Sequence, residues 1–162
     1  MKQLVTYPDP VLSKKAGRVV KFNSQLRELI KNMIETMDLE GGIGLAAPQI
    51  GVSKQVIVIK DSRETRALIN PVLTWFSKEL SPSKEGCLSC PDLWKTVMRH
   101  NSVTVQFQRI DGGKATCKFT DLESCCVQHE IDHLQGKTLY DYEDLTDIFE
   151  VKQEKPKSRF LY

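Results

Sequence analysis

The chain has 162 residues, of which 40% are hydrophobic and 27% are charged, values typical of one globular domain that is long enough to bury a core. The 23 Lys and Arg residues nearly balance the 21 Asp and Glu residues, and the formal charge of +2 is too small to indicate binding to DNA or to a membrane surface. No hydrophobic run approaches the ~18 residues needed to span a bilayer, so we expect a cytoplasmic protein.

The N-terminal half predicts one amphipathic helix and one buried strand. Hydrophobic residues recur at helical spacing from Ser24 until a Gly-Gly pair interrupts the pattern, which predicts a helix with one face in the core. The glycine-rich segment that follows carries a single polar side chain, Gln49, which either faces a site or satisfies backbone groups. The apolar run 55–59 predicts a buried strand, and a further strand over 68–75 is expected to be broken at Pro71.

The C-terminal half predicts a β-hairpin followed by a second helix. Apolar and polar residues alternate over 103–107 and again over 115–119, with Asp-Gly-Gly between the two segments, which is the pattern of two paired strands joined by a turn. Thr120 and Glu123 have the spacing of a capping box. The glycine after the apolar pattern is a natural helix stop, so we expect a helix over about 121–135.

This second helix contains His129-Glu130-Ile131-Asp132-His133, which fits the pattern H-E-x-x-H. On a helix the two histidines lie one turn apart on the same face, so both imidazoles reach one metal ion. Glu130 is offset around the helix axis, in the position expected of a general base rather than a ligand. The alternative interpretation is that both histidines are satisfied core residues.

A catalytic metal site of this kind needs a third protein ligand and one open position. Leu139 stands where the extended metalloprotease pattern requires a histidine, and Glu150 and Glu154 lie in a segment without helical periodicity. His100 lies outside the apolar pattern and is expected to be exposed. We expect the third ligand to be Cys87, because the glycine before it lets the backbone approach closely; its C-x-x-C spacing has no second Cys pair to complete a structural zinc site.

These elements predict an α+β fold in a single compact domain over residues 1–162. We expect antiparallel or mixed β-sheets packed around a central helix that carries the H-E-x-x-H motif, with an amphipathic helix N-terminal to them. The segment 144–162, which is acidic first and basic later, predicts no regular element and is treated as a C-terminal tail.

Three motifs together resemble those of the peptide deformylase family. In chain order they are Gly42-Ile43-Gly44-Leu45-Ala46-Ala47-Pro48-Gln49, Glu85-Gly86-Cys87-Leu88-Ser89 and Gln128-His129-Glu130-Ile131-Asp132-His133. Their order and spacing also match, and the resemblance extends from about Leu4 to Gly136, which is most of the chain. The resemblance implies removal of the formyl group from the N-terminal formyl-methionine of new polypeptides, with release of formate.

The resemblance also implies a cofactor and partners. Cys87, His129 and His133 would hold one divalent metal ion, which in this family is usually Fe2+, although Zn2+, Ni2+ or Co2+ suit the same ligands. The substrate would be the formyl-Met N-terminus of a nascent peptide. We expect a monomer. For the basic end of the tail two interpretations stay open, a weak electrostatic contact with the ribosome and, favoured over it, a solvated tail.

Catalytic and substrate-binding roles are implied as well. Glu130 would transfer protons, while the Gln49 amide and the Leu88 backbone N–H would donate hydrogen bonds to the substrate carbonyl oxygen. Arg99 is a candidate partner of Glu85. The residues that would border the pocket for the methionine side chain are Ile43, Gly44, Glu85, Leu122, Cys125, Cys126 and His129.

Two other functions are compatible with the sequence. A metallopeptidase would use the same helix with a different third ligand and would cleave unformylated peptides internally. A catalytically silent, ribosome-associated metal-binding module would keep the fold without turnover, although the intact Glu130 and Gln49 argue against silence. Release of formate from a formylated peptide distinguishes both from a deformylase.

Overall fold

The computed structural model describes residues 3–61, 63–149 and 162. With η for a 3-10 helix, its elements are η1 (Pro10–Ser13), α1 (Ser24–Leu39), β1 (Gly44–Ala46), η2 (Ala47–Ile50), β2 (Val56–Lys60), β3 (Thr65–Phe76), β4 (Leu80–Cys87), β5 (Cys90–His100), β6 (Ser102–Gln108), β7 (Lys114–Thr120), α2 (Asp121–Leu134) and η3 (Leu139–Asp141). The α+β class expected from the sequence is confirmed.

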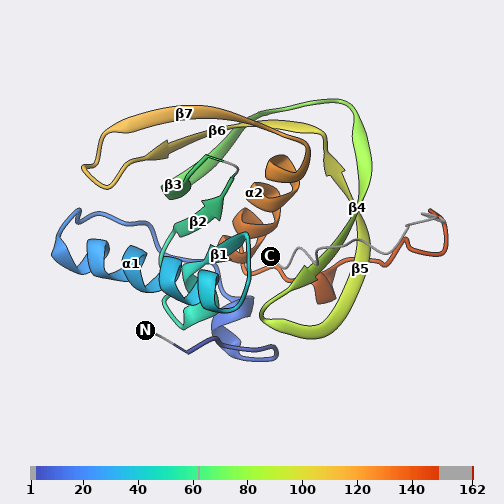
Figure 1. Ribbon diagram of the computed structural model, residues 1–162, viewed down its shortest axis with the longest axis horizontal. Helices are drawn as coiled ribbons and strands as arrows, with labels where there is room; N and C mark the ends of the chain where they lie inside the picture. Colours follow the sequence, from blue (N-terminus) through green and yellow to red (C-terminus); the bar gives the residue numbers. More distant parts are fainter. Residues whose placement is uncertain (1–2, 62, 150–161) are drawn as a thin grey trace.

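The strands form two antiparallel sheets. Five strands pair in the order β1-β2-β3-β6-β7, and β4 pairs with β5 in a separate hairpin. Figure 1 shows α2 between the five-stranded sheet and the β4–β5 hairpin, with α1 alongside β1 and β2. Because both sheets reach α2, side chains from the hairpin and from the helix are able to meet.

Both faces of β2 are buried, which explains its continuous apolar sequence. Ile57 and Ile59 belong to the hydrophobic core that includes residues of α2, whereas Val56 and Val58 belong to a second core that includes residues of α1. Side chains alternate between the two faces of a strand. One short strand therefore contributes to both cores.

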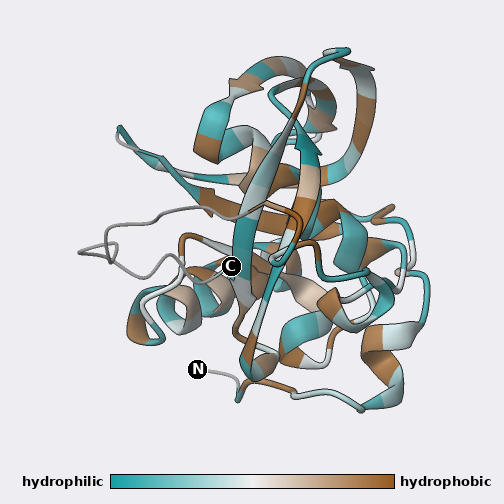
Figure 2. Ribbon diagram, turned by 90° about the vertical axis from the view of Figure 1, so that its right-hand side faces the viewer, coloured by the Kyte–Doolittle hydropathy of each residue, from teal (hydrophilic) through white to brown (hydrophobic). Residues whose placement is uncertain are grey.

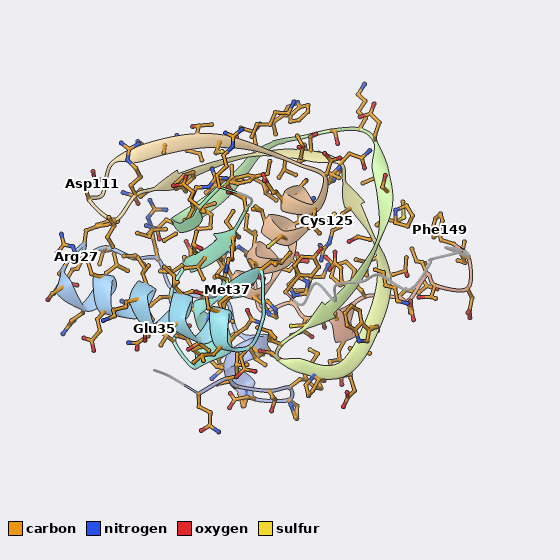
Figure 3. The ribbon with its side chains drawn as sticks, viewed as in Figure 1. Arg27, Glu35, Met37, Asp111, Cys125 and Phe149 are labelled. Carbon is orange, nitrogen blue, oxygen red and sulfur yellow. The ribbon has the colours of Figure 1, made fainter. Side chains whose placement is uncertain are left out.

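Helix α1 packs one face against this second core. The side chain of Asn23 caps the helix by accepting a hydrogen bond from the Leu26 N–H at 3.1 Å, which satisfies one of the free donors of the first turn. Figure 3 shows Arg27 and Glu35 extending outward from α1, whereas Met37 lies toward β1. Met37 is fully buried, so this face of the helix is stabilised by hydrophobic contacts.

Hydrophobic residues occur in short stretches along the chain. Figure 2 shows hydrophobic and hydrophilic positions alternating along the helices and strands, as expected where one side of each element faces a core. Among the residues that the structure describes, no helix combines the length and apolar character needed to cross a membrane.

Two local predictions are wrong. Strand β3 is not broken at Pro71 but runs through it, and its register against β6 shifts between Ile69 and Val72. The irregularity accommodates proline, which has no N–H to donate to the ladder. At the start of α2, the side chain of Thr120 makes no capping hydrogen bond, so the expected capping box with Glu123 does not form. Thr120 is still the last residue of β7 and is held in the extended conformation of that strand.

The end of α2 is formed by the expected glycine. Gly136 has a φ of 75°; its N–H donates to the His133 carbonyl at 3.1 Å, and the Lys137 N–H donates to the Asp132 carbonyl at 2.9 Å. These two bonds are those of a Schellman motif. A Cβ at Gly136 would lie 2.8 Å from backbone atoms of Ser13, so the glycine also allows the N-terminal segment to pack against the end of the helix.

Asn70 supplies a first test of the fold. Its buried side chain accepts a hydrogen bond from the Val19 N–H at 2.8 Å, and it donates to the Val19 carbonyl at 2.9 Å and to Gln108 Oε1 at 2.8 Å. We expect Asn70→Ala to lower the free energy of unfolding by about 2–3 kcal/mol, because it leaves backbone groups of the buried Val19 without partners.

Urea denaturation measures this change in stability. Gln106→Ala is the matched control, because Gln106 is exposed on the neighbouring strand β6, and it should change stability by less than about 0.5 kcal/mol. Equal losses in the two variants would contradict the role of Asn70.

Candidate metal centre and active site

Three buried side chains from two elements converge beside α2. Cys87 is the last residue of β4, and His129 and His133 lie one turn apart in α2. Their sulfur and nitrogen atoms all lie within 4.8 Å of one another, and Cys87 Sγ is 3.3 Å from His133 Nε2. The helix thus provides two candidate ligands, and the end of the hairpin strand provides the third.

His129 is held in the tautomer that a metal ligand requires. Its Nδ1 lies 2.9 Å from Glu85 Oε2, and because a carboxylate accepts hydrogen bonds, Nδ1 carries the proton. Its Nε2 is buried and has no hydrogen-bond partner among the residues that the structure describes. A lone pair in that position, together with a second imidazole and a thiol, fits a divalent metal ion.

The other two candidate ligands are also buried. Burial and the neighbouring His129 lower the pKa of His133 well below its usual range, which leaves this imidazole neutral and able to bind a metal. The hydrogen bond with the Cys90 thiol and burial raise the pKa of Cys87. A bound cation would reverse the effect on Cys87, because a coordinating thiol is deprotonated.

Glu85 is fully buried, and its charge is stabilised by Arg99. Arg99 Nε and Nη2 donate to the two carboxylate oxygens, each at 2.9 Å, so the pairing anticipated from the sequence is present. Burial alone would raise the pKa of Glu85, but the hydrogen bonds from Arg99 and His129 lower it to about 2. The Glu85 carboxylate therefore faces Arg99 and His129.

Arg99 also contacts α2. Its Nη1 and the Tyr142 hydroxyl both donate to Asp132 Oδ2 at 2.7 Å.

Glu130 lies close to Cys87, on the same helix as the two histidines. Both of its carboxylate oxygens are buried and have no hydrogen-bond partner within the described part of the chain. Burial, followed by the negative charge of Glu85, raises the pKa of Glu130 well above its usual range. A raised pKa makes this carboxylate a stronger proton acceptor than an exposed glutamate.

Gln49 and Leu88 place two hydrogen-bond donors near this cluster. Gln49 is fully buried in η2; its Oε1 accepts a hydrogen bond from the Ala46 N–H at 2.8 Å, and its Nε2 donates to Cys87 Sγ at 3.6 Å. Both interpretations of Gln49 therefore hold, since it satisfies a backbone group and also faces the site. The Leu88 backbone N–H donates to the carbonyl oxygen of Tyr162 at 2.8 Å.

Only some of the residues expected around the methionine side chain line one cavity, and Gly44, Glu85, Cys125 and His129 are not among its lining residues. Ile43, Leu122 and Cys126 line an open cavity of about 480 Å³. Cys125 lies on the side of α2 that faces β4, as Figure 3 shows, and its thiol lies near Ser83. The contribution of Ser83 is missed by sequence reasoning, because no pattern predicts β4.

Three further contributors are also missed. Cys90 pairs with Cys87 at the turn between β4 and β5, Tyr142 completes the network around Arg99, and Tyr162 packs on His129. The C-x-x-C spacing could have indicated a two-residue turn between paired strands. No local signal identifies the two tyrosines.

The expectation that His100 is exposed is wrong. His100 ends β5 and is half-buried, with its Nδ1 2.7 Å from the Ser77 carbonyl oxygen and its ring packed on Phe76 at a centroid distance of 4.6 Å. It lies outside the group of candidate ligands. Glu150 and Glu154 lie outside the described residues.

Comparison with known proteins gives a consistent result. A family model described as Polypeptide deformylase matches residues 1–147. A peptide deformylase from Microchaete diplosiphon is 41% identical over 165 residues, which cover 99% of this chain and 87% of the relative. Among solved structures, a peptide deformylase from Thermotoga maritima aligns with a TM-score of 0.85 and 35% identity, covering 87% of this chain and 96% of its own. A probable peptide deformylase from Synechococcus phage S-SSM7 aligns with a TM-score of 0.84 and 39% identity, covering 88% of this chain and 100% of its own.

The contact between Glu85 and His129 leads to a prediction about metal binding. We expect Glu85→Gln to weaken divalent-metal binding about 10- to 100-fold, because it removes the carboxylate that orients His129 and makes it a better ligand. Competition with a chelator measures the affinity for Co2+, and circular dichroism checks the fold. Glu79→Gln, at an exposed position near the start of the same hairpin, is the control. Unchanged affinity in Glu85→Gln would refute this role.

Proposed function

The chain belongs to the peptide deformylase family. From this membership and the site geometry we propose which role each site residue has in the reaction. Deformylases remove the N-terminal formyl group of formyl-methionine by metal-dependent hydrolysis, yielding formate and a free amine. The observation that carries this function is the convergence of Cys87, His129 and His133 in a chain whose relatives are deformylases. Neither a metallopeptidase nor a silent metal-binding module is favoured.

Cys87, His129 and His133 would hold one divalent metal ion. A metal bound there supplies Lewis acidity, which lowers the pKa of water and polarises the formyl carbonyl. Fe2+ is the metal that we propose for the cell, while Zn2+, Ni2+ and Co2+ are compatible with the same donors. Support comes from the buried His129 Nε2, which has no other partner among the described residues.

Glu130 is the proton carrier in this proposal. It takes a proton from the attacking water and later delivers one to the leaving amine. Its complete burial and raised pKa support this role. So does the lack of a competing hydrogen bond to either carboxylate oxygen from the described residues.

Gln49 and Leu88 stabilise the negative charge that develops on the substrate carbonyl oxygen. The Gln49 side-chain amide and the Leu88 backbone N–H would donate to that oxygen, and donors of this kind are effective because they are oriented before the reaction. For Gln49, the hydrogen bond from the Ala46 N–H to Oε1 sets the amide so that its Nε2 is directed at the site.

The methionine side chain enters a pocket next to the metal ligands. Cys125 stands where a larger aliphatic residue is common in the family, so we expect a pocket of different size near this position. The proposed lining residues are Ile43, Gly44, Glu85, Leu122, Cys125, Cys126 and His129. The enzyme would act as a monomer on nascent chains in the cytoplasm. The basic residues proposed to contact the ribosome lie beyond position 149, in a segment outside the described residues.

The proposed role of Glu130 is tested by substitution. We expect Glu130→Ala to lower kcat for formyl-Met-Ala-Ser by about 10²- to 10⁴-fold, because the proton-transfer group is removed, while the metal content stays unchanged. Formate release and metal analysis on one anaerobically purified sample measure both. Glu35→Ala, at an exposed position on α1, is the control. Full activity in Glu130→Ala would refute the role, and internal cleavage of an unformylated peptide would favour a metallopeptidase.

The identity of the metal is tested by exposure to air. We expect the iron-loaded enzyme to lose activity in air, because ferrous iron next to a thiolate is readily oxidised together with its ligand, and nickel substitution to preserve activity. Metal analysis before and after exposure shows which ion is bound. Equal, air-stable activity with zinc would count against iron.

A further inference from the structure

Tyr162 lies against the metal-binding helix. Its side chain is 2% exposed, and its ring centroid lies 5.2 Å from that of His129, with an angle of 34° between the planes. It belongs to the hydrophobic core that includes Cys126 and Ile131 of α2. Figure 1 shows this position, marked C, beside α2. A large side chain therefore fills space directly next to one of the metal ligands.

The backbone of Tyr162 pairs with the end of β4 as an added strand would. The Tyr162 N–H donates to the Gly86 carbonyl at 3.3 Å, and the Leu88 N–H donates to the Tyr162 carbonyl at 2.8 Å. These two hydrogen bonds flank Cys87. An extended peptide that binds along a strand edge makes backbone hydrogen bonds of the same kind, so Tyr162 is bound as one residue of such a peptide would be.

The Tyr162 side chain adjoins the pocket proposed for methionine. Its hydroxyl lies near Ser83, Glu85, Cys125 and Cys126. An aromatic ring with one polar end suits a pocket whose wall combines apolar side chains with polar groups.

We propose that Tyr162 occupies the place of the substrate's first residue and competes with the substrate for the active site. This inference rests on the proposed function, because it uses the roles assigned to Leu88 and to the pocket. Tyr162 and a formylated peptide exclude each other, since both need the space beside His129 and the Leu88 N–H. The apparent affinity for substrate then equals the intrinsic affinity multiplied by the fraction of molecules in which Tyr162 has left the site.

Removal of the Tyr162 side chain tests the competition. If Tyr162 occupies the site in about nine of ten molecules, Tyr162→Ala should lower the KM for formyl-Met-Ala-Ser about 10-fold. The kcat should stay unchanged, because no catalytic group is altered. Trp75→Ala removes an aromatic side chain that is 48% exposed on β3 and should change neither constant. An unchanged or raised KM in Tyr162→Ala would overturn the proposal, whether or not that variant is also less stable.

Binding without turnover separates this proposal from the function on which it rests. In calorimetry with the nickel-loaded full chain, N-acetyl-tyrosinamide should bind Tyr162→Ala about 10-fold more tightly than the unaltered protein, and the peptide Met-Ala-Ser should displace it. Tyr162→Phe keeps the ring and loses the contact with Ser83, so its affinity for N-acetyl-tyrosinamide should lie between those of Tyr162→Ala and the unaltered protein. If these affinities are found but the protein releases no formate, the competition by Tyr162 is supported and the proposed deformylase activity is rejected. Equal binding by all three proteins would reject the competition.

Discussion

The buried ion pair between Glu85 of β4 and Arg99 of β5 also contacts α2, the helix that carries two of the candidate metal ligands. The Glu85 carboxylate is held by the Arg99 guanidinium through two hydrogen bonds and also binds His129. Removing these charges from water is costly, and the cost is offset only when geometry and hydrogen bonding are favourable. Asp132 binds the same guanidinium from α2. The hairpin is thus fixed against α2 where Cys87 meets the histidines.

No single element contains the site. Cys87 comes from the end of β4, His129 and Glu130 come from α2, and Gln49 comes from a short 3-10 helix after β1. The two hydrophobic cores hold these elements in register, because β2 is buried between them and pairs with β1. The position of the Gln49 amide relative to Cys87 therefore depends on packing in both cores.

The sequence predicted those parts of the site that lie within one helix or one short motif. The H-E-x-x-H spacing places both histidines on one helical face through helix geometry alone, and the hairpin of β6 and β7 follows from alternation and a glycine turn. The β4–β5 hairpin has no such signal: β4 contains Pro82 and is exposed at most of its first positions. Pairing with β6 also overrides the break expected at Pro71. The place of Tyr162 depends on contacts with residues distant in sequence, which local periodicity does not encode.

Gly44 determines how closely the backbone of β1 approaches the Glu130 carboxylate. A Cβ at this position would lie 2.5 Å from Glu130 Oε1 and 2.7 Å from Cys126 Sγ, distances that real Cβ atoms essentially never show. Any of the other encoded amino acids would have to displace either the carboxylate or the strand. A substitution at Gly44 would therefore disturb Glu130 directly, although Gly44 itself has no side chain.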